Sequence, residues 1–545
     1  MTLKMPLEML YHWETTQPTT VYLRQPINGE FKEYSWADTA NLVRRIAAAL
    51  KALDLPPGSR IALLSKNCAE WFIADLAIMM AGHISVPIYF TASNDTISYI
   101  LKHSDSKAVF LGKLDDMESQ LEAIPEHITR LSFPYQVAPD SIRWEQLLAQ
   151  PPIKENISRS GDETMTIVYT SGSTGQPKGI VNTFHAFAWS CQTLSTVIPA
   201  SLSDRVISYL PLAHITERVY VEGSSFYNGY QVSFVESLDS FAHDVKAVQP
   251  TMFLSVPRLW IRFQMGVLAK IPQSKLDFLL KIPFIGCLVA KKIRKELGLN
   301  STFIWGSGAA PISVATLRWY NRLGINISEG WGMTENNAIG TIGYPFRKDK
   351  IGSIGRPVVP ENLRISAEGE IQLRGPNIMK EYYLAPELTA GAFTEDGWLK
   401  TGDKARMDDE GYVFITGRLK EIFKTAKGKY IAPVPIEALL MENSLIEQVC
   451  VTGSNLKQPV ALLVLTPEAA QLPKDKLASS LNNTLEQVNS RLEGHEQLDT
   501  LIVMSEDWTT ENGLLTPTLK IKRTVVEEKY QKVIDSHYSE KVVFT

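Results

Sequence analysis

Tyr169-Thr-Ser-Gly-Ser-Thr-Gly-Gln-Pro-Lys-Gly179 combines three glycines, four serine or threonine hydroxyls and one lysine within eleven residues. Glycines allow backbone N–H groups to turn toward a ligand, while hydroxyls add donors and lysine adds a mobile positive charge. The apolar run at residues 165–169, directly before the loop, is typical of a buried strand. Because α/β proteins bind ligands at the carboxyl ends of strands, this stretch predicts a polyphosphate-binding loop in an α/β fold.

The loop differs from a Walker A motif, which has Gly-Lys followed by Ser or Thr at the start of a helix. Here Lys178 lies between Pro177 and Gly179. Proline has no N–H donor and fixes its own φ angle, so a helical phosphate cradle is not expected at this point. The alternative interpretation is a solvated linker rich in Ser, Gly and Thr. A linker, however, needs neither the preceding strand nor the lysine.

The composition excludes several classes of protein. The 545 residues are 44% hydrophobic and 21% charged, which suits a globular chain with a large core and more than one domain. The net charge of −4 gives no reason to expect nucleic-acid binding. The four cysteines are far apart and show no metal-ligand spacing, which favours a reducing cytoplasm. The N-terminus lacks a secretory apolar core, and no run reaches the roughly 18–20 apolar residues that span a bilayer.

The organisation of the chain changes twice. Up to about residue 350, strand-like apolar runs alternate with helical patterns, which predicts mostly parallel sheets covered by helices. Residues 355–417 alternate like half-exposed antiparallel strands, and a shorter α+β unit follows. We therefore predict an α/β fold with two domains: residues 1–419, including a small antiparallel β subdomain, and a small mobile domain, residues 420–545. The expected strands are 59–65, 108–111, 166–169, 206–210, 302–305, 370–374, 411–416, 448–453 and 460–465, and the expected helices 36–52, 313–323, 436–444 and 477–492.

The loop pattern [ST]-G-[ST]-T-G-x-P-K-G closely resembles the signature of the acyl-adenylate-forming superfamily, which includes acyl-CoA synthetases, luciferases and peptide-synthetase adenylation domains. Further segments match in the expected order, so the resemblance covers nearly the whole chain. It implies that the residues that bind the phosphates of ATP are Thr170, Ser171, Gly172, Ser173, Thr174, Gly175 and Lys178.

Residues 328–335 (SEGWGMTE) resemble the adenine and metal segment of this superfamily. The resemblance implies that Trp331 stacks on adenine beside Gly332, that Thr334 binds the α-phosphate, and that Glu335 helps to hold Mg²⁺. The superfamily usually has tyrosine at the aromatic position, so Trp331 keeps the π-face and lacks the hydroxyl. A hard cation needs a carboxylate, and polyphosphate supplies further oxygen ligands.

Three other segments extend the resemblance to the rest of the site. Residues 305–312 (WGSGAAPI) are similar to the loop that lines adenine and the acyl pocket, which implies roles for Gly308 and Ala309. Asp403 and Arg418 match the ribose-binding pair. Residues 209–217 (YLPLAHITE) resemble the segment beside the carboxylate substrate, which makes His214 a candidate for orienting the acyl group; the alternative is a packed structural histidine.

The C-terminal unit carries the last group of matches. Residues 515–523 (LTPTLKIKR) resemble the motif with the catalytic lysine, which aligns with Lys520; Lys522 is the second candidate. Lys420 falls at the hinge position, and Gly428 is expected near the pantetheine arm of coenzyme A. Lysines around Gly428 could attract the phosphates of coenzyme A, or form only a solvated basic loop. The full form of residues 417–437 is more similar to long-chain fatty acyl-CoA synthetases than to peptide-synthetase domains.

The resemblance implies an AMP-forming long-chain fatty acid–CoA ligase that uses ATP, Mg²⁺ and coenzyme A. The fatty acid would be adenylated and then transferred to the thiol, with rotation of the small domain between the steps. The alternatives are a ligase that passes the acyl group to a carrier protein, a medium-chain or other carboxylate–CoA ligase, a luciferase-like oxygenase, and a non-catalytic lipid-binding scaffold.

Residues 275–298 mix large apolar residues with six basic ones. The pattern favours an ordinary surface helix pair, broken at Pro283, with its apolar side on the core. The alternative is peripheral contact with an anionic membrane surface.

Overall fold

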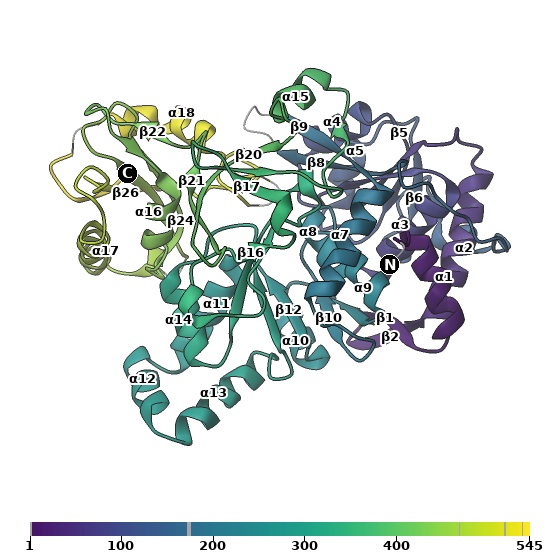
Figure 1. The fold of residues 1–545 in the computed structure, drawn as a ribbon, viewed down its shortest axis with the longest axis horizontal. Helices are drawn as coiled ribbons and strands as arrows, with labels where there is room; N and C mark the ends of the chain where they lie inside the picture. The colour runs from purple at the N-terminus through teal and green to yellow at the C-terminus, as the bar shows by residue number, and fades with distance from the viewer. Residues whose placement is uncertain (1–2, 172–175, 468, 517–518, 537) are drawn as a thin grey trace.

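The computed structural model describes residues 3–171, 176–467, 469–516, 519–536 and 538–545 and has a mixed α/β architecture (Figure 1). Within these residues the largest sheet has eight strands, parallel except at one edge, where β9 and β19 are antiparallel. Its order is β19 (Glu381–Tyr382), β9 (Pro177–Thr183), β8 (Thr164–Ser171), β4 (Ile84–Ile88), β3 (Arg60–Leu64), β5 (Ser106–Leu111), β6 (Thr129–Ser132) and β7 (Ile142–Arg143).

Helices cover this sheet because their apolar faces pack on its buried strands. Helix α2 (Trp36–Ala52) begins at Ser35, whose hydroxyl accepts the N–H of Asp38 at 3.1 Å. It packs on α3 (Ala69–Ala81), which is buried nearly all round and ends at Gly82 in a left-handed conformation. The chain then continues into β4.

Two further sheets extend the large part of the chain. One has the order β10 (Arg205–Ser208), β11 (Gln231–Phe234), β1 (Val21–Ile27) and β2 (Glu30–Ser35). The other runs β12 (Met252–Ser255), β13 (Ile304–Ser307), β14 (Ile327–Trp331), β15 (Thr341–Ile342) and β16 (Arg356–Pro357), of which the first three are parallel. Helices α11 (Pro257–Lys270), α12 (Gln273–Lys281), α13 (Ile285–Glu296) and α14 (Val314–Arg322) share one apolar cluster with β12, β13 and β14.

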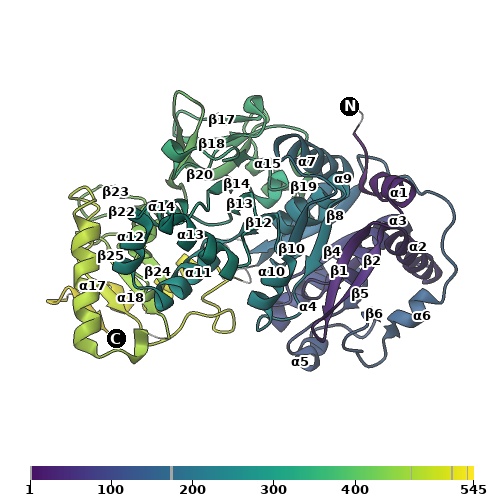
Figure 2. The same ribbon diagram turned by 90° about the horizontal axis from the view of Figure 1, so that it is seen from below.

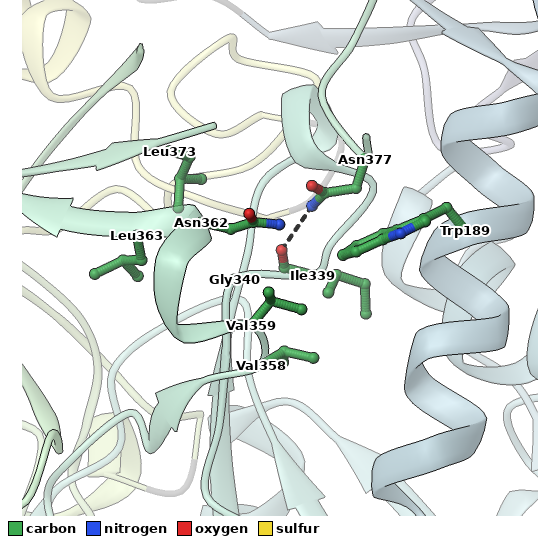
Figure 3. Close-up of a pocket in the computed structure, with 9 residues that line it drawn as sticks. All are labelled: Trp189, Ile339, Gly340, Val358, Val359, Asn362, Leu363, Leu373 and Asn377. Carbon is green, nitrogen blue, oxygen red and sulfur yellow. Dashed lines mark hydrogen bonds between the residues drawn. The ribbon is translucent and has the colours of Figure 1, made fainter. Parts of the chain in front are cut away.

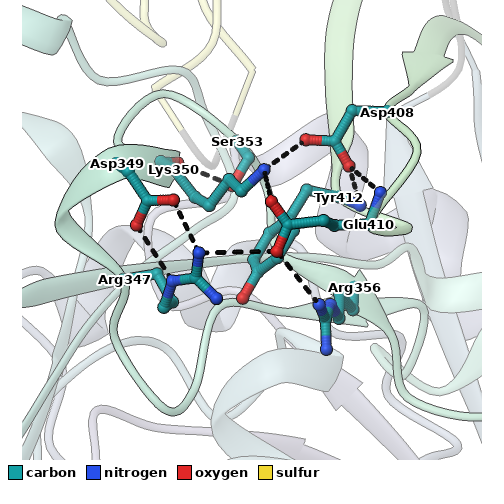
Figure 4. Close-up of polar contacts among 8 residues, drawn as sticks. All are labelled: Arg347, Asp349, Lys350, Ser353, Arg356, Asp408, Glu410 and Tyr412. Carbon is teal, nitrogen blue, oxygen red and sulfur yellow. Dashed lines mark hydrogen bonds and ion pairs between the residues drawn. The ribbon is translucent and has the colours of Figure 1, made fainter.

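An antiparallel sheet follows, with the order β17 (Leu363–Ile365), β18 (Glu370–Leu373), β20 (Leu399–Met407) and β21 (Val413–Arg418). A network of surface charges ties the turn between β20 and β21 to the segment before β16 (Figure 4). Lys350 reaches Asp408 at 2.9 Å and Glu410 at 2.6 Å, and Glu410 also meets Arg347 at 3.4 Å. The antiparallel sheet is thereby held against the sheet that contains β14.

The C-terminal part lies at one end of the molecule, opposite α1 (Pro6–Thr16) and α2, in both views (Figures 1 and 2). It contains the hairpin β22 (Phe423–Lys424) and β23 (Tyr430–Ile431) and a sheet of β24 (Ile446–Thr452), β25 (Val460–Leu465), β26 (Leu501–Val503) and β27 (Val542–Phe544). Helices α16 (Pro433–Leu440), α17 (Lys474–Asn489) and α18 (Arg523–Ile534) bury their apolar sides on this sheet.

The predicted fold class is confirmed, and most predicted elements are present within one to three residues. The helix expected at 36–52 and the strand expected at 460–465 have those bounds. The strand expected at 302–305 is β13, displaced by two residues because its pairing with β12 runs from Ile304 opposite Met252 to Ser307 opposite Ser255. No helix among the described residues is long and apolar enough to cross a membrane.

Candidate functional site

The glycine-rich loop is the turn of a β-hairpin. Tyr169 of β8 pairs with Gly179 of β9, and Thr170 pairs with Lys178. Gly179 is required here because a Cβ would lie 2.9 Å from the Ile167 side chain and 3.2 Å from the Tyr169 ring. A hairpin rather than a helix therefore follows β8, as the position of Pro177 predicts. The backbone of Ser171 closes β8, and Gly172, Ser173, Thr174 and Gly175 lie outside the described residues.

Lys178 and Glu335 both contact Tyr382. The Lys178 ammonium lies 4.7 Å from the centroid of the Tyr382 ring, and the Tyr382 hydroxyl donates to Glu335 Oε1 at 2.9 Å. Burial, followed by the charge of Glu335, raises the pKa of Tyr382, so the hydroxyl keeps its proton and acts as the donor. One aromatic side chain thus connects the lysine of the loop with the candidate metal ligand.

The turn that carries Glu335 is held from behind by asparagine side chains. Asn377 Nδ2 donates to the carbonyls of Asn336 and Ile339, both at 2.9 Å, and Figure 3 shows the bond to Ile339. Asn337 in turn donates to the carbonyl of Asn377 at 3.0 Å. Thr334 and Glu335 form the start of this short 3₁₀ turn, and both are buried. Buried hydrogen bonds of this kind fix the turn, so the direction of the Glu335 carboxylate is preset.

Trp331 provides an aromatic ring for stacking, and its indole N–H also forms a hydrogen bond with Asp403. Its indole N–H donates to Asp403 Oδ2 at 2.9 Å, while Arg418 Nε donates to Asp403 Oδ1 at 2.7 Å. A Cβ at Gly340 would lie 2.6 Å from the indole, and one at Gly332 would lie 2.4 Å from the Ala338 backbone. Both glycines therefore permit close packing around the ring. The hydroxyl that tyrosine would supply is absent, and the indole N–H provides a polar contact of its own.

Gly308 and Ala309 follow the end of β13, next to the end of β14. A Cβ at Gly308 would lie 3.1 Å from the carbonyl oxygen of Gly330. Ala309 has a positive φ of 66°, which is uncommon for a residue other than glycine. This backbone therefore passes close to the strand that ends at Trp331, as the small residues predict.

His214 precedes α8 (Ile215–Glu217), and its Nδ1 accepts the N–H of Thr216 at 3.2 Å. This bond requires the ring proton on Nε2, which leaves Nε2–H as the donor on the other side of the ring. Burial, followed by the positive charge of Lys520, lowers the pKa of His214 to about 4. His214 is therefore neutral at ordinary pH.

The segment after His214 is anchored by a buried acid, Glu217, whose pKa burial raises to about 8, and by a buried ion-pair group around Arg218. Glu217 accepts the Ser208 hydroxyl at 2.7 Å and the Tyr209 N–H at 3.2 Å, which ties α8 to the end of β10. Arg218, which is fully buried, contacts Asp75 and donates to Glu222 at 3.1 Å. Because breaking a buried ion pair is costly, these contacts hold the backbone of the His214 segment in place.

Lys520 lies in a tight turn of the C-terminal part. The Thr516 N–H donates to the Lys520 carbonyl at 2.8 Å, and the Lys520 N–H donates to the Thr516 hydroxyl at 3.0 Å. Leu515 and Ile521 form an antiparallel bridge at the base of the turn. Leu519, next to the lysine, has a positive φ of 59° and is exposed. Residues 517 and 518 lie outside the described residues.

The charges that act on Lys520 come from both parts of the chain, Arg418 and Asp403 from the large part and Glu421 from the C-terminal part. Solvent reaches the residue, but the surrounding protein lowers the pKa of Lys520 to about 8, first by desolvation and then by the charge of Arg418. Asp403 and Glu421 act in the opposite direction. The charge of Lys520 also acts on His214, so Lys520 is within electrostatic range of His214, Arg418 and Asp403. Lys522, the second candidate, begins α18 instead.

Two predicted residues lie apart from this group. Lys420 is exposed in the turn after β21, where the Leu419 N–H donates to the Gly402 carbonyl at 2.8 Å. Gly428, with φ of 75°, lies in the exposed turn between β22 and β23. The neighbouring Lys427 donates to Gln458 at 3.0 Å. The turn with Gly428 therefore belongs to the C-terminal part and does not line the group around Lys520.

The donor set fits Mg²⁺ only if the ion arrives with a polyphosphate. Glu335 Oε1 is occupied by Tyr382, whereas for Oε2 the described residues provide no hydrogen-bond partner. They also contain no group of three or more His, Cys, Asp or Glu side chains that could hold a metal. A single free carboxylate oxygen suits an ion that takes its other ligands from phosphate and water.

Sequence reasoning missed Tyr382, Asn377, Asn337 and Glu217, which position the predicted residues without resembling ligand-binding groups themselves. The available signal for Tyr382 was the tyrosine pair at residues 382–383, soon after the Gly-Pro turn at 375–376. The asparagines carry no such signal, because polar residues near glycines are usual in turns.

Comparisons with known proteins agree with this geometry. Residues 10–383 match the model of the AMP-binding enzyme family, and residues 420–542 match that of the AMP-binding enzyme C-terminal domain. The chain is 29% identical to the long-chain-fatty-acid–CoA ligase FadD15 of Mycobacterium bovis, covering 97% of this chain and 96% of that protein. It is 30% identical to the peroxisomal long chain acyl-CoA synthetase 6 of Arabidopsis thaliana, covering 94% of this chain and 82% of that protein. The fold matches the A domain of carboxylic acid reductase from Segniliparus rugosus, solved with AMP and a co-purified carboxylic acid, with a TM-score of 0.80 and 21% identity over 97% of this chain and 93% of that one.

Proposed function

Because the chain belongs to the AMP-binding enzyme family, we propose that it is an AMP-forming long-chain fatty acid–CoA ligase. The fatty carboxylate attacks the α-phosphate of ATP, which gives acyl-AMP and pyrophosphate. The thiol of coenzyme A then attacks the acyl carbon, which gives acyl-CoA, AMP and a proton. The names of relatives that span the whole chain support the substrate class.

The observation that supports this proposal is the Asp403–Arg418 pair, which lies within electrostatic range of Lys520, as does His214. In the proposed reaction Asp403 accepts the ribose hydroxyls, and Arg418 holds Asp403 in place at 2.7 Å. Trp331, whose indole N–H is bonded to Asp403, lies beside the same sugar, and the face of its ring stacks on adenine. A lysine near a bound AMP moiety counters the repulsion between two anions, which is the main electrostatic obstacle to adenylation.

The carboxylate of the fatty acid is held by two donors. His214 Nε2–H is free to donate because Nδ1 is occupied by Thr216. The Lys520 ammonium, protonated below its pKa of about 8, bridges the carboxylate and the α-phosphate. Thr334 donates to the same phosphate. These residues orient the attack and hold its charges without transferring a proton.

On the pyrophosphate side, the backbone of the β8–β9 loop and Lys178 bind the leaving group. A bound Mg²⁺ would supply Lewis-acid neutralisation of the phosphate oxygens. Glu335 would hold it through Oε2, while Tyr382 keeps Oε1 in place. Gly308, Ala309 and Gly332 leave room for the nucleotide beside the end of β14.

We further propose that residues 1–419 and 420–545 are two domains that reorient between the two reactions. Lys520 belongs to the first reaction, and the turn around Gly428 approaches the pantetheine arm in the second. Lys420, exposed in the connecting turn, is the expected hinge. The variant Lys420→Pro should restrict residue 419 and leave one orientation trapped, so overall turnover should fall while one half-reaction persists. Unchanged turnover would contradict the hinge.

Four free cysteines, three of them buried, support a reducing compartment, and we propose the cytoplasm.

The direct test is substrate-dependent exchange of labelled pyrophosphate into ATP, followed by thioester formation from the same acid. We expect exchange with fatty acids and AMP release on addition of coenzyme A, across a series of chain lengths. Acyl transfer to a carrier protein but not to coenzyme A would favour the carrier-dependent alternative. The absence of exchange with any carboxylic acid would refute the proposed reaction.

A further inference from the structure

We propose that the hairpin of α12 and α13, residues 273–296, is a docking surface for an anionic lipid bilayer. The two helices project from the body at the lower edge of the molecule in Figure 1. They meet at the connection 282–284 that the sequence predicts from Pro283. Their inner side packs on the body through Leu276, Ala290 and Ile293, which are buried.

The outer side of this hairpin is apolar at its tip. Phe278 is 65% exposed, Phe284 86%, Ile285 44% and Leu288 68%. Phe284 also has a positive φ of 64°, an unusual conformation for a bulky residue. The expectation that the apolar side would lie on the core is therefore wrong for the tip, because only the opposite face reaches the body. Several large apolar side chains gathered in one exposed place indicate an interaction site.

Basic residues surround the apolar tip. On α12, Lys275 and Lys281 lie three residues before and after Phe278, so all three share one face. On α13, Ile285 and Leu288 share a face with Lys292 and Lys295 by helical spacing, and Lys291 borders it. All five lysines are exposed. Long lysine side chains next to an apolar tip can reach lipid head groups while the tip enters the acyl region.

The charges of the hairpin are unbalanced in a way that fits an anionic partner. Its two acidic residues are already used: Asp277 pairs with Arg322 at 2.5 Å and Glu296 with Lys246 at 3.4 Å. Within the described part of the chain, the five lysines have no ion-pair partner: Lys275, Lys281, Lys291, Lys292 and Lys295. Arg294 instead donates to the Leu323 carbonyl on the body at 2.5 Å.

A lipid bilayer fits these observations better than a second protein. The apolar residues lie at the convex end of a projecting hairpin rather than in a groove, so they can enter a soft interface but provide no pocket for a partner side chain. The unpaired positive charge matches the surface potential of anionic lipids. The hairpin also shares one apolar cluster with β13 and β14, whose carboxyl ends carry Gly308 and Trp331.

The test is flotation of the full-length protein with vesicles, which needs no turnover and so is independent of the proposed reaction. The vesicles contain phosphatidylcholine alone, or phosphatidylcholine and phosphatidylglycerol in equal amounts. We expect binding to the anionic vesicles to be at least about tenfold stronger, and to weaken between about 0.1 M and about 1 M salt, because salt screens the lysines.

Two variants separate the apolar and the charged contribution. Phe284→Ser with Leu288→Ser should reduce binding to anionic vesicles by about tenfold, and Lys291→Gln with Lys292→Gln should reduce it and remove most of the salt dependence. The matched controls are Leu238→Ser, a leucine 83% exposed elsewhere, and Lys476→Gln with Lys532→Gln on the C-terminal part. The controls should bind like the wild type.

Three results would overturn the proposal. The first is a wild-type protein that does not float with anionic vesicles. The second is a Phe284→Ser, Leu288→Ser variant that floats as well as the wild type although both have equal thermal stability. The third is a wild-type dimer, seen by light scattering, that this variant converts to monomers, which would assign the surface to a second copy of the chain.

Discussion

Glu335 and Lys520 both belong to the candidate site, but the protein holds them in very different ways. Glu335 is 8% exposed, its carboxylate is fixed by Tyr382, and its turn is fixed by Asn377. Lys520 lies in a short exposed turn beside Leu519, a residue with positive φ. The carboxylate is therefore preset, whereas the lysine depends on how the C-terminal part is positioned.

This difference matches the two reactions that we propose. The nucleotide remains bound in both reactions, so the residues that contact it bind it better when the surrounding structure holds them rigidly. The lysine is needed only while two anions react, and must leave before coenzyme A approaches. An exposed turn, with few contacts to lose, can be withdrawn at a small free-energy cost. The predictions below test whether the two sides of the site act in these separate ways.

The variant Lys520→Ala should have the largest effect, because it removes the mobile charge entirely. Loss of one such electrostatic contact to the reacting groups costs about 10²–10³ in rate. We expect pyrophosphate exchange to fall by that factor, while thioester formation from supplied acyl-AMP is largely retained. Lys522→Ala, which changes the neighbouring lysine, is the control and should keep both reactions. Equal loss of both half-reactions in Lys520→Ala would contradict its separate role.

Tyr382→Phe tests the rigid side. It removes the hydroxyl bond to Glu335 at 2.9 Å but keeps the ring beside Lys178. A hydrogen bond to a charged group contributes about 1.5–3 kcal/mol, so exchange should fall roughly ten- to hundredfold. Because the lost contact orients Glu335, the Mg²⁺ concentration for half-maximal exchange should rise, and Mn²⁺ binding with ATP should weaken in calorimetry.

Tyr383→Phe is the matched control for this experiment, since Tyr383 instead packs on His103. It should leave the Mg²⁺ dependence unchanged. A Tyr382→Phe enzyme with lower stability but a normal Mg²⁺ dependence would show that the tyrosine only supports the fold.

The pH dependence of adenylation should include the loss of the Lys520 proton, and the buried acids Glu217 and Glu329, whose pKa burial raises to about 8, titrate in the same range. The pKa of Lys520 is lowered to about 8, first by desolvation and then by Arg418, so the ammonium is present below pH 8 and lost above it. We expect the exchange rate to fall about tenfold per pH unit above that value. His214, with a pKa of about 4, is already neutral at pH 5 and adds no limb between pH 5 and 7.

Lys520→Arg sharpens this test because arginine stays protonated above pH 12. Its rate should be lower but free of the limb near pH 8. A limb that persists in Lys520→Arg would have to come from another group.

The sequence predicts the fold well where the local pattern and the tertiary environment agree. The helix at 36–52 has an apolar stripe and a serine cap, so its bounds follow directly from its residues. The position of β13 does not follow in this way, because it is set by pairing with β12, where Met252 lies opposite Ile304, 52 residues later in the chain. The exposed tip at Phe284 could not be predicted either. Helical periodicity shows that a face is apolar, but not whether the body reaches it.

For the site, the ligand-facing residues could be predicted and their supports could not. Trp331, Asp403, Arg418 and Lys520 are separated along the chain, yet each stands in a motif whose chemistry is evident. The bond from the Trp331 indole to Asp403 depends on how β14 faces β20, which no local pattern encodes. Supporting residues such as Asn377 donate hydrogen bonds to backbone carbonyls. Asparagines in turns commonly bond to the backbone, so the sequence does not distinguish this one from any other.

The smallest effect is expected at the contact between the two parts. Arg258 on α11 forms an ion pair with Glu447 at the start of β24, and this pair favours the orientation seen here. Exposed ion pairs contribute about 0–1 kcal/mol, so Glu447→Gln should lower adenylation by no more than about fivefold. If the orientation serves the first reaction, thioester formation from supplied acyl-AMP should stay equal or rise slightly.

Arg491 forms a similar surface pair with Glu442 within the C-terminal part, at 2.9 Å, so Glu442→Gln is the control and should change neither reaction. Equal losses in both half-reactions for Glu447→Gln would mean that the pair stabilises the fold rather than this orientation.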